Sequence, residues 1–132
     1  MEAVIAIDTN ILVRHITEDD PAQLRRVHSL FRAHPKEGDI FISLIVLLEL
    51  NWVLESCYQW SHQKFCNAVE DILRCAQFTI EHPTVVKIAI SGYRKNQDFS
   101  DALIGQIAIS RGIRVYTFDK ALQNDSAFVV LD

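Results

Sequence analysis

Residues 4–8 read Val-Ile-Ala-Ile-Asp, a short run of apolar and mostly β-branched side chains that ends on a carboxylate. A continuous apolar run of this length is typical of a strand buried on both faces, and such strands belong to parallel sheets covered by helices. Similar short runs recur along the chain and predict further strands at residues 40–42, 78–80, 114–117 and 128–131.

Amphipathic segments separate these runs and predict helices. Asp20 has the position of an N-cap, Pro21 that of the first helical residue and Gln23 that of the reciprocal capping partner. The spacing of apolar residues predicts helices over residues 21–34, 43–56, 61–75, 83–92 and 99–110. Alternating strands and helices define the α/β class. We therefore expect residues 1–132 to form one domain, an α/β/α sandwich with a mainly parallel central sheet of four to five strands.

The composition fits a cytoplasmic globular domain. The chain has 132 residues, 49% of them hydrophobic, with 17 acidic against 13 basic residues and a formal net charge of −4. An acidic chain is not expected to bind nucleic acid mainly through a basic surface. Cys57, Cys66 and Cys75 show no disulfide or zinc spacing and are expected to be free thiols. No export or membrane-spanning segment is predicted.

Two carboxylates directly follow predicted strands. Asp8 follows the first strand and Asp119 follows the fourth. The carboxyl edge of an open parallel sheet is where ligands bind, so these two acids are candidate site residues. Asp is also a favoured turn and N-cap residue, and that structural role is an equally good interpretation of either one taken singly.

Asp98 and Asp101 form a D-x-x-D pattern at the start of a predicted helix. The same spacing occurs in a capping box, and for Asp98 the capping interpretation is favoured. It is weaker for Asp101, because Glu or Gln is the usual reciprocal partner and Asp is shorter.

Glu49 lies within a strongly apolar helical segment, residues 44–54. Its neighbours one turn away are Ile45, Val46, Trp52 and Val53, which is not the pattern of a solvated helix face. An ionised carboxylate on an apolar face is costly unless it is paired or binds a cation. A metal or a distant partner is therefore the favoured interpretation.

Carboxylate oxygens without nearby His or Cys select hard cations such as Mg²⁺ or Mn²⁺. The five histidines show no zinc-site spacing. Clustered carboxylates with such ions are a common apparatus for hydrolysing phosphodiesters, because the metal activates water and neutralises charge on the phosphate.

These residues together resemble a known family. Asp8-Thr9-Asn10, Glu49, the segment 98–104 (Asp-Phe-Ser-Asp-Ala-Leu-Ile) and Thr117-Phe118-Asp119 resemble, in this order, the motifs of PIN-domain ribonucleases, especially the VapC-type toxins of bacterial toxin–antitoxin pairs. The resemblance spans nearly the whole chain. One departure is that Asn96-Gln97 precedes the D-x-x-D pattern, where a glycine or small residue is common.

The resemblance implies that Asp8, Glu49, Asp101 and Asp119 form a catalytic acidic pocket that holds one or two Mg²⁺ or Mn²⁺ ions, with Asp98 as an auxiliary ligand. It places Asn10 and Thr117 as polar residues that orient acids or water. It implies cleavage of single-stranded RNA by metal-activated water, leaving 5′-phosphate and 3′-hydroxyl ends. It also implies a homodimer and a VapB-like antitoxin whose tail occupies the active-site groove.

Arg14 follows Asp8 by less than two helical turns and is expected near the groove as a substrate-binding residue. Setting the five pocket acids aside leaves 12 acidic residues against 13 basic ones, so the acidity fits a concentrated pocket on a near-neutral body.

Two alternatives remain open. Residues 5–8 also begin the first motif of haloacid dehalogenase-like phosphatases, but Asn10 occupies the position of that motif's second Asp. A non-catalytic binding module is the other, and it would be favoured if divalent metal fails to bind.

Overall fold

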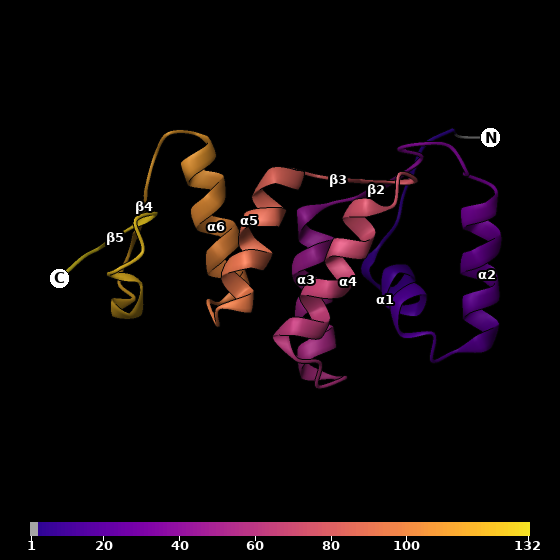
Figure 1. Ribbon diagram of the computed structural model, residues 1–132, viewed down its shortest axis with the longest axis horizontal. Coiled ribbons are helices and arrows are strands. Elements are labelled where there is room, and N and C mark those ends of the chain that lie inside the picture. The colour runs from indigo at the N-terminus through magenta and orange to yellow at the C-terminus, as the bar shows by residue number, and fades with distance from the viewer. Residues whose placement is uncertain (1–2) are drawn as a thin grey trace. The chain divides into compact units, whose positions relative to one another are not determined.

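The computed structural model describes residues 3–132, which divide into two compact units, Met1–Pro83 and Thr84–Asp132 (Figure 1). The first unit contains β1 (Ile5–Ala6), α1 (Thr9–Thr17), α2 (Pro21–Arg32), β2 (Ile40–Ile42), α3 (Leu44–Ser56), α4 (His62–Arg74) and β3 (Phe78–Ile80). The second contains α5 (Pro83–Arg94) apart from its first residue, α6 (Phe99–Ser110), β4 (Val115–Thr117), the short 3₁₀ helix η1 (Lys120–Leu122) and β5 (Phe128–Val130).

Every strand pairing among the described residues is parallel, as predicted. In the first unit the strand order is β1-β2-β3, with Ile5 opposite Ile40 and Ile40 opposite Phe78. In the second unit β4 pairs with β5, and Val115 lies opposite Phe128. The α/β class is confirmed. The expected four to five strands are present as one sheet of three and one of two, and the assignment of residues 1–132 to a single domain stays a prediction.

The predicted helices do not include residues 9–17, which form a nine-residue helix, α1. Two stated expectations also differ from the structure of the first unit. The run 4–7 is not buried on both faces, because β1 lies at an edge of its sheet; Ile7 is buried but Val4 is 59% exposed. The side chain of Gln23 does not cap back to Asp20, because its Oε1 accepts a hydrogen bond of 2.8 Å from Nε of Arg14.

The helices of the first unit pack around its sheet and bury a continuous set of apolar residues. Helix α1 packs on α2 and α3, and α4 packs on α3 and β3. Leu12 of α1, Leu50 of α3 and Phe65 of α4 are almost completely buried. This packing fixes the N-terminus of α1, where Asp8 lies, relative to α3, which carries Glu49.

In the second unit α6 packs on β4 and approaches β5 closely. Gly105 allows this approach, since a Cβ there would lie 2.9 Å from Cε2 of Phe128 and 3.0 Å from Cβ of Ala127. The rings of Tyr93 and Phe99 meet edge to face, with centroids 5.7 Å apart. These contacts order the N-terminus of α6, where Asp98 and Asp101 lie.

All three cysteines are free, as predicted. Among residues 3–132, no helix has the length and apolar character needed to cross a bilayer.

Candidate active site

The first unit places Asp8 and Glu49 on either side of Thr9. Asp8 is the N-cap of α1, and its Oδ1 accepts a hydrogen bond of 3.1 Å from the Ile11 backbone nitrogen. Thr9, the first residue of α1, donates from Oγ1 to Oε1 of Glu49 at 3.2 Å. The end of β1 and the middle of α3 are thereby connected through one hydroxyl group. The two acids therefore belong to one local cluster.

Glu49 lies on an exposed face of α3, contrary to the expectation that its apolar neighbours withdraw it from water. Helix α3 is apolar on nearly all sides, and it turns Leu47, Leu50 and Leu54 inward. The opposite face carries Glu49 between Ile45, which is 71% exposed, and Trp52, which is 65% exposed. Apolar neighbours on a helix wheel do not by themselves bury a residue when the helix has more apolar residues than its core contacts can cover.

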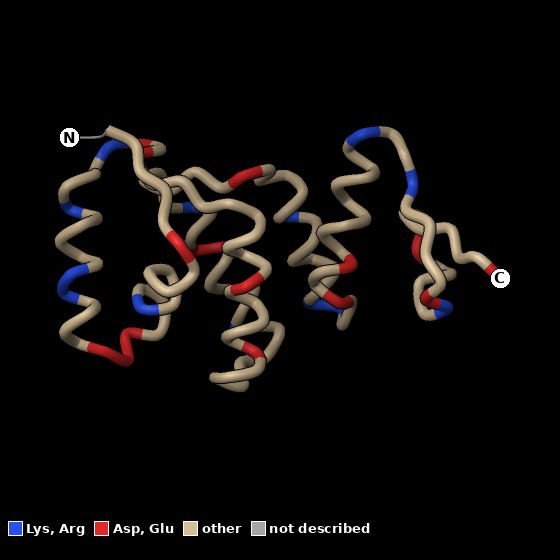
Figure 2. Tube along the Cα trace, turned by 180° about the vertical axis from the view of Figure 1, so that it is seen from behind, with Lys and Arg blue, Asp and Glu red and all other residues tan. Residues whose placement is uncertain are grey.

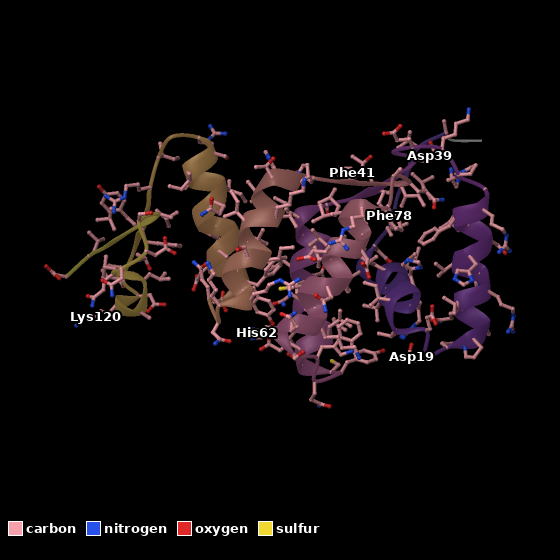
Figure 3. The ribbon with its side chains drawn as sticks, in the orientation of Figure 1. Asp19, Asp39, Phe41, His62, Phe78 and Lys120 are labelled. Carbon is pink, nitrogen blue, oxygen red and sulfur yellow. The ribbon has the colours of Figure 1, made fainter. Side chains whose placement is uncertain are left out.

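Arg14 lines a cavity together with Asp8, and three side chains hold its guanidinium group. Besides the bond to Gln23, its Nη1 lies 2.7 Å from Oδ1 of Asp19 and donates to the Tyr58 hydroxyl at 3.1 Å. Tyr58 in turn donates to Oδ2 of Asp19 at 2.7 Å. Figure 3 labels Asp19 in the turn between α1 and α2. Arg14 thus lies near Asp8, as expected, with its charge offset by an acid of the same unit.

The hydrogen bonds to Asp19 change its acidity. The Tyr58 hydroxyl, followed by those from Thr17 and Arg14, stabilises the ionised carboxylate and lowers its pKa to about 2. The same contacts raise the pKa of Arg14. Arg14 and Asp19 therefore form a permanently ionised pair over the ordinary pH range.

The second unit brings together Asp98, Asp101 and Asp119. Asp98 is the N-cap of α6, and its Oδ1 accepts from the Asp101 backbone nitrogen at 2.9 Å. The pKa of Asp101 is raised, first by partial burial and then by the negative charges of Asp98, Asp119 and Asp125. Thr117 accepts at Oγ1 from the Asp119 backbone nitrogen at 3.0 Å, so it fixes the chain at Asp119, and its role toward a metal or water stays a prediction.

The capping interpretation of three acids is confirmed, and it leaves room for a second role. Asp119 caps η1 by accepting from the Ala121 backbone nitrogen at 2.9 Å, as Asp8 caps α1 and Asp98 caps α6. Each cap uses Oδ1 alone. A carboxylate has two oxygens, so each of these aspartates keeps Oδ2 for another ligand. Asp101 and Glu49 cap no helix.

Within the described part of the chain, no group of three or more His, Cys, Asp or Glu side chains is arranged to hold a metal ion. The acids instead form two partial sets, Asp8 with Glu49 in the first unit and Asp98, Asp101 and Asp119 in the second. The donor chemistry of both sets fits a hard divalent cation, because all donors are carboxylate oxygens. Burial and then the nearby negative charges raise the pKa of Asp101, and a cation relieves repulsion between such charges.

Sequence reasoning missed two residues of this region, Thr9 and Gln23. From the sequence, Thr9 is predicted only as part of the Asp8-Thr9-Asn10 motif, and Gln23 only as a capping residue. The available signal was that each is a polar residue in the first turn of a helix, where side chains face the element that precedes the helix. The hydrogen bonds that join Thr9 to Glu49 and Gln23 to Arg14 could not be predicted, because they depend on how the helices pack.

Comparison with known proteins identifies the family to which the chain belongs. A family model described as "PIN domain" matches residues 5–125. The chain belongs to the PIN-domain family, which confirms the resemblance and removes the main support for the phosphatase alternative. A protein named "VapC ribonuclease" from Aquifex aeolicus (strain VF5) is 27% identical over 110 residues, which cover 82% of this chain and 81% of that protein. No solved structure gives a significant match.

Proposed function

We propose that the protein is a Mg²⁺- or Mn²⁺-dependent endoribonuclease and the toxin of a type II toxin–antitoxin pair. The observation that carries the proposal is the placement of the acids. Each unit contains part of the acid set that the family motifs define. Asp8, Asp98 and Asp119 cap helices, Asp101 lies in the first turn of α6, and Glu49 lies on α3 next to Thr9. The name of the Aquifex aeolicus relative supports RNA as the substrate.

Asp8, Glu49, Asp101 and Asp119 are the residues that would hold the metal, with Asp98 as an auxiliary ligand. A bound divalent ion lowers the pKa of its water and offsets charge on the phosphate oxygens. The chain's own contribution is orientation. Capping bonds fix Asp8, Asp98 and Asp119 so that Oδ2 of each remains available.

The two polar residues of the motifs have different roles in this proposal. Thr117 orients Asp119 through the bond to its backbone nitrogen. Asn10 is exposed and lines the same cavity as Asp8, where its amide group can orient water or RNA. Arg14 lines the cavity, but Asp19 offsets its charge. It therefore contributes more to the shape of the cavity than to its charge.

We extend the proposal to two protein partners, a VapB-like antitoxin and a second copy of the chain. The name of the relative supports the first. The exposed apolar side chains of α3, Ile45, Leu48 and Trp52, support contact with another apolar surface. Light scattering after gel filtration, with and without co-expression of the neighbouring reading frame, tests both partners.

The activity test uses acid-to-amide variants. Asn is also a good N-cap, so Asp8→Asn keeps the cap of α1. Asp101 caps no helix, so Asp101→Asn removes a negative charge without removing a cap. We expect the purified wild-type chain to cleave single-stranded RNA with Mn²⁺ and to stop when EDTA is added. Both variants should lose at least about 100-fold in rate, which corresponds to roughly 2.7 kcal/mol of the barrier.

Asp71→Asn is the matched control, because Asp71 is an exposed acid of α4 outside the proposed site. It should cleave at the wild-type rate. Wild-type rates in Asp8→Asn and Asp101→Asn, or cleavage that continues in EDTA, would overturn the proposal.

A further inference from the structure

A cavity of about 380 Å³ lies between α1 and α2 and opens beside Asp8. Its walls are two facing helix stripes. Asn10, Ile11 and Arg14 line it from α1, and α2 contributes Gln23, Arg26, Val27 and Leu30, spaced at i, i+3, i+4 and i+7. Figure 2 shows basic residues recurring along α2 and acidic residues gathered in the turn before it.

Hydrogen-bond donors dominate the polar lining away from Asp8. The carbonyl oxygen of Gln23 is occupied by Arg14, so the group that Gln23 can still offer is its NH₂ donor. Arg26 is exposed and, within residues 3–132, makes no ion pair. Arg14 cannot swing away, because Asp19 and Tyr58 fix its guanidinium group. The cavity therefore combines the Arg26 guanidinium group, which has no ion-pair partner among residues 3–132, with the fixed NH₂ donor of Gln23 and the amide of Asn10.

Apart from Asn10, the rest of the lining is apolar. Val27 is buried, and Ile11 and Leu30 are partly buried. A phosphate group gains nothing from such a surface, whereas the flat face of a nucleobase does. The cavity has the mixed character of a site for a planar, acceptor-bearing ring: an apolar surface with a few placed polar groups.

We propose that this cavity, which opens beside Asp8, binds a guanine base of the RNA next to the cleaved bond. Guanine presents two adjacent acceptors, O6 and N7, whereas adenine and cytosine each present an amino donor on the corresponding edge. Arg26 and the Gln23 amide supply donors for those acceptors. The position relative to the cleaved bond rests on the proposed ribonuclease function; the preference for guanine rests on the cavity alone.

The first test measures binding without metal and without cleavage. The full-length chain in EDTA is titrated with guanosine 5′-monophosphate, cytidine 5′-monophosphate and inorganic phosphate, and the amide resonances of Asn10 and Val27 are followed by NMR. We expect guanosine monophosphate to bind most tightly. Arg26→Gln should weaken it by about 5- to 150-fold, the range for loss of a good base contact.

Arg25→Gln is the matched control, because Arg25 is the adjacent exposed arginine of α2 and does not line the cavity. It changes the net charge equally and should weaken binding less than twofold. Equal losses in Arg25→Gln and Arg26→Gln, or equal affinity for inorganic phosphate and guanosine monophosphate, would overturn the proposal.

The second test reads base preference during cleavage of a randomised RNA pool with Mn²⁺. Gln23→Glu keeps the acceptor for Arg14 but replaces the NH₂ donor with a second acceptor. We expect both Gln23→Glu and Arg26→Gln to cleave the pool while losing a guanine preference at one position beside the cut. Cleavage with an unchanged preference in both variants would overturn the base site and leave the ribonuclease proposal standing. If the wild type cleaves no RNA, that proposal fails and the NMR titration still decides the base site.

Discussion

The hydroxyl group of Thr9 donates a 3.2 Å hydrogen bond to Oε1 of Glu49, 40 positions later in the chain. Thr9 directly follows Asp8, so this one bond orients the acid on α3 relative to the acid at the end of β1. Glu49 is exposed and forms no ion pair within the described residues. The bond to Thr9 is therefore the contact that selects its side-chain position.

Thr9→Val tests this role, because it keeps the shape of the side chain and removes the hydroxyl group. We expect the Mn²⁺ concentration for half-maximal RNA cleavage to rise roughly 2- to 10-fold, the usual worth of one such hydrogen bond. The rate at saturating metal should change little. Thr9→Ser retains the hydroxyl and should restore the wild-type metal dependence. An equal loss in both variants would indicate a packing role instead.

Tyr58→Phe should raise the pKa of Asp19, because the Tyr58 hydroxyl is the largest cause of its lowering to about 2. A lowered carboxylate pKa stabilises the fold above the unfolded pKa of about 3.9, and this contribution is lost as pH falls toward 2. The free energy of unfolding of Tyr58→Phe should therefore fall less than that of wild type over this pH range. Carboxyl ¹³C NMR measures the pKa directly, and an unchanged value in Tyr58→Phe would contradict the assigned cause.

His15 makes the fold sensitive to mild acid. Its ring lies 5.1 Å from that of Phe31 and 5.8 Å from that of Phe78, and its Nδ1 has no hydrogen-bond partner. Burial, and then the charge of His28, lower the pKa of His15, while Glu18 opposes the shift. The neutral ring is thus favoured in the native state, so stability falls as pH drops below the unfolded value of about 6.5.

Replacing His15 with Leu should flatten this dependence. We expect the difference in unfolding free energy between pH 7.5 and pH 5, measured with urea, to shrink, and the variant to be more stable than wild type at pH 5 by about 1 kcal/mol, since it removes a buried unpaired polar atom. His28→Gln should remove only part of the dependence, because burial is the larger cause. A wild-type slope in His15→Leu would refute the assignment.

Gly105→Ala should destabilise the second unit although Ala favours helices by about 1 kcal/mol. The new Cβ would meet the buried ring of Phe128 and the Cβ of Ala127 at 3.0 Å or less. Overpacking of this kind costs about 1–3 kcal/mol, so after the helix gain a net loss of up to about 2 kcal/mol is expected in thermal or urea unfolding. Phe128→Leu in the same chain should recover part of it. A Gly105→Ala variant that is more stable than wild type would contradict this expectation, because it would show that β5 shifts to accommodate the new Cβ.

The α/β class, the parallel strands and most helix boundaries could be predicted because they depend on local patterns. Ser43 caps α3 and Ser61 caps α4 through their own side chains, which is chemistry visible within four residues. The exposure of Glu49 could not be predicted, because it depends on which face of α3 the neighbouring helices cover. The predicted capping role of Gln23 was also wrong, because Arg14 of another helix donates to its side-chain carbonyl oxygen.

Among the site residues, the aspartates illustrate a different limit. The sequence left capping and metal binding as alternatives for Asp8, Asp98 and Asp119, whereas the structure shows capping through one oxygen and leaves the other available. The two interpretations were never exclusive. Their second role stays a prediction, as do the roles of Asn10 and Arg14 toward RNA.

The central claim is the proposal that Asp8, Glu49, Asp101 and Asp119 serve as ligands for a divalent metal. Calorimetric titration of the full-length chain with Mn²⁺ tests it without RNA, using Asp8→Asn from the first unit, Asp101→Asn from the second, and Asp71→Asn as the control. The account predicts that either site variant alone weakens Mn²⁺ binding at least tenfold, while Asp71→Asn binds like wild type. Wild-type Mn²⁺ affinity in either site variant would contradict it.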